Sequence, residues 1–243
     1  VLTAVVEGSQ TDAGSSANVV KSYRVMRGGV DVTDFYTFGE IENGTLTVTE
    51  RKVTLTSKSA DKPYDGTPLT NHNVTVSGDG FVTGQGASYT FTGSQLDVGS
   101  SKNTFDYELN DNTKAKNYKI TKEYGDLTVT AVSTQIVITA NSKTEVYSGQ
   151  AVTDSGYTYT GKLAEGDKLE VEVVGSQTDK GSSKNWFTYT LTEGTKADNY
   201  TITQEYGELV VTKNTSVINI TAKSANKTYD GQALTEPRYD FTQ

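Results

Sequence analysis

The chain has 243 residues, no cysteine and a formal net charge of −8. This acidic balance argues against nucleic acid as a partner, because binding to phosphate needs a basic surface. The lack of cysteine excludes disulfides and thiolate metal sites, and no apolar run approaches the roughly 18 residues of a membrane-spanning helix. The first residues, Val1–Ala4, are not those of a signal peptide, and we expect the chain to be part of a longer protein.

The first 57 residues contain runs that are typical of β-strands. Within residues 1–50 these runs are Leu2–Val6, Val19–Met26, Asp34–Phe38 and Thr45–Glu50. The pair Asn43-Gly44 before the last run predicts a hairpin, since Asn-Gly favours tight turns between paired strands. Residues 51–57 alternate apolar and polar side chains with period two, as a half-buried strand does.

The next stretch adds further expected strands. The expected strands are Asn73–Ser77, Ala87–Thr92, Thr104–Leu109 and the two runs that start at Asn117 and Asp126. Thr, Val and Tyr dominate these runs, as they do on pleated, half-buried surfaces. No stretch has apolar residues at helical spacing over three turns, so the sequence predicts an all-β fold without a long helix.

Two short motifs recur along the chain. The pattern Gly-Ser-Gln-x-Asp-x-Gly-Ser-Ser-x-Asn occurs three times, at spacings of 85 and 82 residues, and Tyr-(Asp or Ser)-Gly also occurs three times. Repeats of this length indicate a tandem array of one small module, and their Gly, Ser, Asp and Asn residues favour turns. The expected turn residues are Gly8, Asp12, Gly14, Asn18, Tyr64, Asp65, Gly66, Gly93, Asp97, Gly99, Asn103, Tyr147, Gly149, Gly175, Asp179, Gly181, Asn185, Tyr229, Asp230 and Gly231.

The repeats resemble those of a known family. Lys-x-Tyr-Asp-Gly early in a module, paired with Asn-Tyr-x-Ile and Gly-x-Leu-x-Val at its end, resembles the MBG/YDG-type repeats of bacterial cell-surface adhesins. Lys62–Gly66 and Lys227–Gly231 carry the first signature. The second is carried by Asn117–Ile120 with Gly125–Val129, and by Asn199–Ile202 with Gly207–Val211. The middle copy departs from it, with Glu145 in place of the lysine. The resemblance implies a repetitive extracellular stalk at the bacterial cell surface.

The family's boundaries divide the chain into four parts. Residues 51–131 and 132–213 would be complete modules, 1–50 the C-terminal part of a module, and 214–243 the N-terminal part of a further one. The end parts would then expose apolar edges that invite end-to-end association with another chain. In the alternative arrangement, each unit is offset by half a period, and 45–50 pairs with 52–57 inside one domain.

Three features of the sequence are candidates for binding or catalytic sites. The Tyr-Asp-Gly turn has the composition of a ligand-facing loop, but a structural turn under a core-edge tyrosine accounts for it more simply. The Asp and Asn of the Gly-Ser-Gln motif offer oxygen ligands for calcium, yet the motif lacks a dense acidic run, and capping of the loop by Asp is favoured. His72, the only histidine, has no recurring partner for catalysis or metal binding.

Trp186 stands out because its counterparts in the repeat are Thr104 and Val19. Neighbouring strand residues point to opposite faces, so if Phe187 lies in the core, Trp186 points outward. An outward Trp would stack on a sugar or a protein partner, or would lie against an adjacent strand. Stalks of Gram-positive bacteria often carry Lys–Asn crosslinks. None is expected here, because no lysine holds a matching strand position in both full modules.

These observations predict a tandem array of small β-sandwich modules of the immunoglobulin-like type that form an elongated rod, with β-grasp modules as the second choice. The expected function is that of a non-enzymatic stalk without cofactors or metal. The alternatives are a module that binds host glycan or protein through exposed aromatic residues such as Trp186, and an accessory module of a secreted hydrolase.

Overall fold

The computed structural model describes residues 1–192 and 194–242, so Glu193 and Gln243, within the expected ranges 132–213 and 214–243, lie outside it. The chain separates into two compact units, Val1–Val132 and Ser133–Gln243. Within the described ranges the only helical elements are three 3-10 turns, and none of them is long enough to cross a membrane. The prediction of an all-β fold is confirmed.

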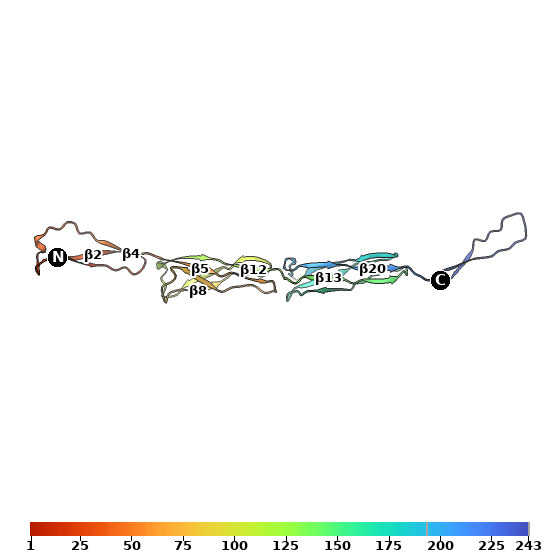
Figure 1. Ribbon diagram of the computed structural model, residues 1–243, viewed down its shortest axis with the longest axis horizontal. Coiled ribbons are helices and arrows are strands. Elements are labelled where there is room, and N and C mark those ends of the chain that lie inside the picture. Colours follow the sequence, from red (N-terminus) through yellow and green to blue (C-terminus); the bar gives the residue numbers. More distant parts are fainter. Residues whose placement is uncertain (193, 243) are drawn as a thin grey trace. The chain divides into compact units, whose positions relative to one another are not determined.

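In the first unit, residues 1–50 form one small antiparallel sheet. Its strands are β1 (Leu2–Glu7), β2 (Gly14–Arg27), β3 (Val30–Asp31) and β4 (Gly44–Val48). The long strand β2 pairs with the other three, and its first residues, 14–18, face β4 (Figure 1). The long β2 is therefore the strand that holds this part together.

Two expectations for this part are wrong. Residues 34–38 are not a strand: a 3-10 turn (η1, Thr33–Phe35) is followed by irregular chain up to residue 43. The Asn43-Gly44 pair does not form a hairpin, because Gly44 already belongs to β4, and the segment before it pairs with no strand. Instead the Asn43 side chain accepts a hydrogen bond from the Val20 N–H at 3.0 Å, which uses the asparagine to fasten the loop to β2.

Residues 51–131, also in the first unit, form two three-stranded mixed sheets and a two-stranded one. The strands are β5 (Arg51–Ser57), β6 (Ala60–Pro63), β7 (Val74–Gly78), β8 (Ala87–Phe91), β9 (Gly99–Lys102), β10 (Phe105–Leu109), β11 (Tyr118–Glu123) and β12 (Asp126–Thr130). The sheet orders are β11-β5-β7, β6-β12-β9 and β10-β8. In Figure 1, β5, β8 and β12 lie within this part of the chain.

The strand β5 takes its partners from residues 58–131. It pairs in parallel with β11, with Val53 opposite Ile120, and antiparallel with β7. The neighbouring strand β6 pairs in parallel with β12, with Ala60 opposite Leu127. Among the described residues β5 has no pairing with β4, which is the pairing that the half-period offset requires. The limits of the modules themselves stay a prediction.

The second unit repeats this pattern. Its strands are β13 (Ile136–Ala140), β14 (Lys143–Val146), β15 (Tyr157–Thr160), β16 (Lys168–Val173), β17 (Gly181–Asn185), β18 (Phe187–Thr192), β19 (Ile202–Glu205), β20 (Gly207–Thr212), β21 (Asn219–Ala222) and β22 (Tyr239–Thr242). Again the first two strands pair in parallel with the last two of the set, β13 with β19 and β14 with β20. Among the residues that the structure describes, β21 and β22 pair only with each other.

The buried core is confined to residues 53–211. Alternate residues of β5, β12, β13 and β20 point inward and are almost fully buried, as strand periodicity dictates. They are Val53, Leu55, Leu127, Val129, Ile136, Ile138, Leu209 and Val211. Burial of one such side chain stabilises the fold by about 1.5–3 kcal/mol. Not one of the described residues in 1–50 or 214–242 is buried.

Candidate functional site

The Gly-Ser-Gln loops have the same internal hydrogen bonds in all three copies. In the first, Gln10 Nε2 donates to the carbonyl of Asp12 at 2.6 Å, and Ser16 Oγ donates to the carbonyl of Ser9 at 3.0 Å. The corresponding pairs in the other copies are Gln95–Asp97, Ser101–Ser94, Gln177–Asp179 and Ser183–Ser176. Gly14 has φ +135°, a conformation that favours glycine. The loops are closed by the glutamine and serine side chains.

The asparagine at the end of this loop is buried in two of the three copies, and there it forms hydrogen bonds to two other segments. Asn185 is fully buried, and its Nδ2 donates to the carbonyls of Asn141 and Asp154, both at 2.9 Å. Asn103 makes the equivalent bonds to residues 58 and 71. Asn18 is only half-buried. The buried asparagines therefore tie their loop to the start of the same strand set, and residues 1–50 contain no such start.

The side chain of Asp12 makes the contact between residues 1–50 and 51–131. Its Oδ1 accepts a hydrogen bond from Asn117 Nδ2 at 2.9 Å, and its Oδ2 lies 2.9 Å from Lys114 Nζ and 3.0 Å from Lys116 Nζ. The Ala13 N–H donates to Asn117 Oδ1 at 2.7 Å. We refer to these five residues as the Asp12 contact.

The Asp12 contact is electrostatically one-sided, since a carboxylate meets two ammonium groups and an amide. The hydrogen bond from Asn117, followed by those from Lys114 and Lys116, holds the pKa of Asp12 well below its usual range. The expectation that Asp12 caps its own loop is wrong: the carboxylate reaches a 3-10 turn (η2, Ala115–Asn117) of the following strand set. The contact therefore fixes two parts of the first unit to one another.

A cleft of about 570 Å³ lies beside the Asp12 contact and is lined by both acidic and basic side chains. Glu50, Arg51 and Asp79 line it together with Asp12 and Tyr118. Two of these residues form hydrogen bonds within the wall of the cleft. Arg51 Nε donates to the Gly80 carbonyl at 2.9 Å, and the Tyr118 hydroxyl donates to Gln85 Oε1 and accepts a hydrogen bond from the Val82 N–H. These bonds hold the cleft wall in place, and the cleft shows no nucleophile paired with a base.

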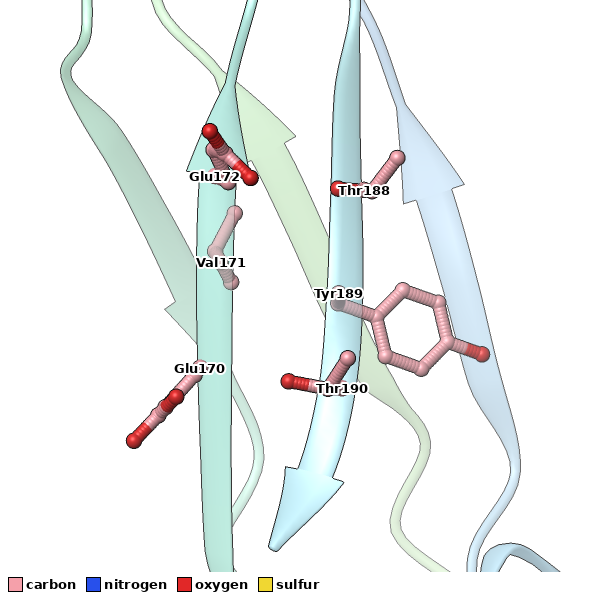
Figure 2. Close-up of a pocket in the computed structure, with 6 residues that line it drawn as sticks. All are labelled: Glu170, Val171, Glu172, Thr188, Tyr189 and Thr190. Carbon is pink, nitrogen blue, oxygen red and sulfur yellow. The ribbon is translucent and has the colours of Figure 1, made fainter.

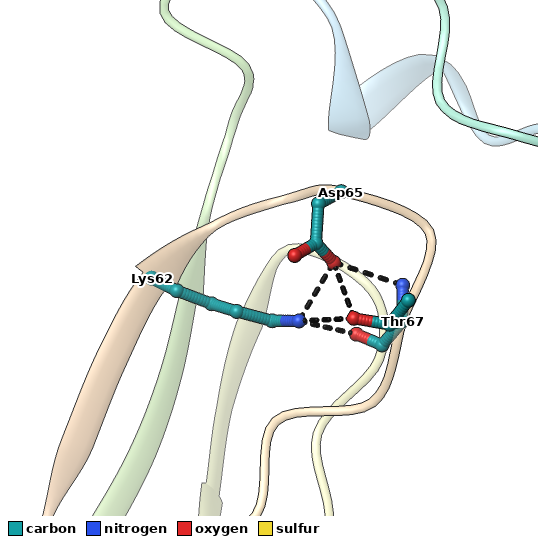
Figure 3. Close-up of polar contacts among 3 residues, drawn as sticks. All are labelled: Lys62, Asp65 and Thr67. Atoms are coloured by element: carbon teal, nitrogen blue, oxygen red, sulfur yellow. Dashed lines mark hydrogen bonds and ion pairs between the residues drawn. The ribbon is translucent and has the colours of Figure 1, made fainter.

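The Tyr-Asp-Gly turn is organised around one carboxylate. Lys62 Nζ lies 2.6 Å from Asp65 Oδ1, which also accepts hydrogen bonds from the Thr67 N–H and hydroxyl at 2.9 and 2.7 Å (Figure 3). These bonds, the one from Lys62 first, lower the pKa of Asp65 to about 2. Gly66 has φ +82°, as the turn requires. All of these groups serve the turn itself.

The other two copies of the turn differ in chemistry but not in backbone. Asp230 repeats the pattern, with Lys227 Nζ at 2.7 Å, whereas Ser148 substitutes for it through a longer bond from the Gln150 N–H at 3.4 Å. The glycines of both copies keep a positive φ. The tyrosines diverge: Tyr64 is buried, but Tyr147 is 42% and Tyr229 93% exposed. A core-edge tyrosine is therefore present only in the first copy.

Trp186 and Phe187 point to opposite faces of their strand, as alternation predicts. Phe187 is 4% exposed and Trp186 is 50% exposed. The ring centroids of Trp186 and Tyr206 lie 4.7 Å apart, and Lys184 Nζ lies 5.3 Å from the centroid of the indole. The Trp thus covers an adjacent strand connection with one face and presents the rest to solvent.

The remaining candidates form no reactive cluster. His72 stacks on Phe91 at 5.1 Å. In Figure 2, Glu170, Glu172, Thr188 and Thr190 lie on β16 and β18 around a shallow pocket of about 170 Å³. Over the part of the chain that the structure describes, there is no group of three His, Asp or Glu side chains placed to share a metal ion.

Sequence reasoning missed the partners of the Asp12 contact. The aspartate and Asn117 belong to two different motifs and lie 105 positions apart. One signal was present: each complete strand set carries a lysine three residues before the asparagine of Asn-Tyr-x-Ile, at Lys114 and Lys196. A lysine that recurs at one position of the turn, together with an aspartate that recurs at one position of the Gly-Ser-Gln loop, is compatible with an ion pair.

Comparisons with known proteins add no relative. No protein-family model matches the chain. No curated protein and no solved structure matches it at a significant level either.

Proposed function

We propose that this chain is a non-enzymatic segment of an extracellular stalk, of the MBG/YDG-repeat type, on the surface of a bacterium. Its modules would be small immunoglobulin-like sandwiches that follow one another as an elongated rod and hold a binding region away from the cell. The observation that carries the proposal is the parallel pairing of first and last strands in both full strand sets.

Parallel pairing of terminal strands suits a protein under tension. The chain enters residues 51–131 at the start of β5 and leaves at the end of β12. When these points are pulled apart, β6 and β12 slide along one another, so that their hydrogen bonds are loaded together. Strands that are peeled from one end break their bonds one by one. The register of Ala60 opposite Leu127 through Pro63 opposite Thr130 places this ladder between the two pulled points.

The Asp12 contact supports the same function at the joint between strand sets. A stalk needs its joints to resist bending, and an ion pair reinforced by two amide hydrogen bonds holds both sides in one orientation. Lys114 and Lys116 are each about 60% exposed, so the contact remains open to screening by salt. Stiffness at this joint should therefore decrease at high ionic strength.

Single-molecule pulling tests the proposal. The chain has no cysteine, so attachment points can be placed freely. The pair Lys52→Cys with Thr130→Cys loads the ladders in shear, whereas Lys52→Cys with Lys119→Cys pulls on two residues that lie opposite one another and peels β5 from β11. We expect a several-fold higher unfolding force for the first pair. Equal forces would remove the support that the strand order gives.

Small-angle scattering tests the proposed rod. A rod gives a maximum dimension well beyond that of a compact globule of 26.2 kDa. A compact profile would contradict the stalk even if the modules proved mechanically strong.

Trp186 favours a second candidate function, the binding of a host glycan or protein. Its half-exposed indole next to Tyr206 and Lys184 is a surface on which a sugar ring can stack. A glycan array probed with the native chain and with Trp186→Ala separates the two functions. Binding that the substitution abolishes would make this chain a ligand-binding module.

A further inference from the structure

The two-stranded sheets β8–β10 and β16–β18 hold the same place in the two full strand sets, but their outer faces differ. In both, alternate residues point away from the buried Phe105 or Phe187. In β8–β10 the outward residues are Ser88, Thr90, Thr92, Thr104, Asp106 and Glu108, and in β16–β18 they are Glu170, Glu172, Val174, Trp186, Thr188 and Thr190. Since residues 51–131 fold without the second set of side chains, the fold does not require them.

The outward polar groups of β8–β10 bind one another. The hydroxyls of Thr92 and Thr104 lie 2.8 Å apart, within hydrogen-bond distance. Lys122 Nζ lies 2.9 Å from the carboxylate of Asp106. These groups are therefore used within the fold.

Neither pair is kept in β16–β18. The two threonines are replaced by Val174 and Trp186, which are 57% and 50% exposed. The lysine and the aspartate are replaced by Gln204 and Thr188. An exposed apolar surface thus takes the place of one pair, and no charge remains at the other.

A lysine from the neighbouring sheet lies against this apolar surface. Lys102 and Lys184 hold the same position, each opposite an acidic residue of the last strand. Lys102 forms an ion pair with Asp126 at 2.7 Å. Lys184 forms no ion pair with a described residue, and its Nζ lies 5.3 Å from the ring centroid of Trp186 and 5.4 Å from that of Tyr206. An ammonium group with unused donors therefore stands beside the indole.

Two carboxylates extend the surface along the strands. Figure 2 shows Glu170 and Glu172 on β16 and Thr188 and Thr190 on β18, around the pocket of about 170 Å³. Glu172 stands opposite Thr188, and Glu170 opposite Thr190. Among the described residues, neither glutamate has an ion-pair or hydrogen-bond partner for its side chain. The outer face thus has an aromatic surface at one end and hydrogen-bonding groups along its length.

An uncharged sugar chain fits these groups. The C–H face of a pyranose ring with equatorial hydroxyls is apolar and packs on an indole, while polar side chains bind the hydroxyls at the edge of the ring. Carboxylates are strong acceptors for such hydroxyls. Two unpaired glutamates, on a chain of net charge −8, repel an acidic sugar.

The length of the face indicates more than one sugar ring. Val174 lies beside Trp186, and Glu170 lies four residues before Val174 on the same face. Four residues of a strand span about 13 Å, which exceeds the reach of a single ring. A β-linked chain is extended enough to follow a strand over this distance.

We propose that the outer face of β16–β18, with Trp186 at its end, binds an uncharged oligosaccharide of β-linked pyranoses. One ring stacks on Trp186 beside Lys184, and the following rings lie along the strands, where Glu172 and Glu170 accept hydrogen bonds from their hydroxyls. This inference rests on the second candidate function, the binding of a glycan, and names the class of glycan.

The tryptophan emission of the native full chain provides the first test, because Trp186 is the only tryptophan. The probes are two matched pairs: a β-linked glucose tetramer with the corresponding glucuronate tetramer, and lacto-N-neotetraose with its sialylated form. We expect at least one uncharged probe to change the emission saturably. Its acidic counterpart should bind roughly tenfold more weakly or less, because the glutamates repel it.

Three variants, measured by calorimetry, separate the contributions. Trp186→Thr introduces the residue of the first set, which preserves the fold, and should abolish binding. Glu172→Gln removes a charge and should reduce the preference for the uncharged probe. Thr104→Trp is the matched control: it places an indole on β8–β10, which lacks the unpaired glutamates, and should leave affinity and stoichiometry unchanged.

The outcomes distinguish this inference from the function on which it rests. If acidic and uncharged probes bind equally and Trp186→Thr abolishes both, the proposed specificity is wrong but the glycan-binding function stands. If Trp186→Thr retains binding, the glycan lies elsewhere and both are wrong. No emission change with either uncharged probe would also overturn the proposal, and a protein partner retained only by the native indole would then assign this surface to a protein contact.

Discussion

Replacement of Asn185 by alanine tests whether the buried asparagine holds its strand set together. The substitution removes the amide that donates to the carbonyls of Asn141 and Asp154, both at 2.9 Å, in a fully buried position. The two hydrogen bonds are part-buried, and each carbonyl that loses its donor beside the buried amide costs about 1–3 kcal/mol. The Asn185 Oδ1 has no hydrogen-bond partner in the structure, so its removal offsets part of this cost. We therefore expect a net loss of about 2–4 kcal/mol.

The chain provides its own reporter for this measurement. Trp186 is the only tryptophan, so its fluorescence follows the unfolding of residues 132–213 alone. For a domain of this size, about 2–4 kcal/mol corresponds to a decrease in melting temperature of roughly 10–25 °C. Thermal melts of the native chain and of Asn185→Ala, recorded at the tryptophan emission, give the shift directly.

Two further variants separate hydrogen bonding from packing. Asn185→Asp keeps the size of the side chain but cannot donate when ionised, so it should destabilise at least as much as alanine at neutral pH and recover partly in acid. Asn18→Ala changes the same motif position where the side chain is half-buried, and it should shift no melting temperature by more than a few degrees. A shift of similar size for Asn18→Ala, or a neutral Asn185→Asp, would refute the reasoning.

Three more outcomes follow from the geometry. Gly207→Ala should destabilise strongly in urea unfolding, because its Cβ would lie 2.0 Å from the Asn141 carbonyl oxygen, whereas Gly44→Ala, with no backbone closer than 3.9 Å, should be neutral. Since the pKa of Asp65 is lowered to about 2, its stabilising effect is complete above the unfolded pKa near 3.8 and is lost as the pH falls toward 2, so Asp65→Asn should flatten acid melts in this range. Thermal melts with and without a chelator should coincide, and a shift of many degrees would contradict this. The intact mass should equal the sequence mass, and a mass lower by one ammonia, the mark of a Lys–Asn crosslink, would contradict the expectation that no such crosslink forms.

Local features of the fold were predictable from the sequence, because they depend on neighbouring residues. Alternation predicts that Phe187 and Trp186 point to opposite faces, with Trp186 outward if Phe187 lies in the core, and the exposed fractions of 4% and 50% agree. The same alternation predicts the buried residues of β5. These patterns depend only on the two-residue period of a strand, which tertiary contacts leave unchanged.

The choice of strand partners was not predictable, because it depends on residues that are distant in sequence. The run 34–38 has strand composition, but no described strand pairs with it, and residues 36–43 are irregular. Asn43-Gly44 has the sequence of a hairpin turn, yet the strand β4 that follows pairs with the distant β2. A segment with the composition of a strand becomes one only where a neighbouring strand satisfies its backbone hydrogen bonds.

In the first Gly-Ser-Gln loop, one set of side chains closes the turn and a different side chain joins the loop to another part of the chain. Gln10 and Ser16 make the internal hydrogen bonds of the loop, and their equivalents do so in all three copies. The carboxylate of Asp12 is not used for closure and is therefore available to Asn117 and two lysines. Because the loop is held by its own hydrogen bonds, it presents the Asp12 carboxylate in a fixed direction. Formation of the Asp12 contact therefore does not have to order the loop, and the conformational entropy cost of the contact is smaller.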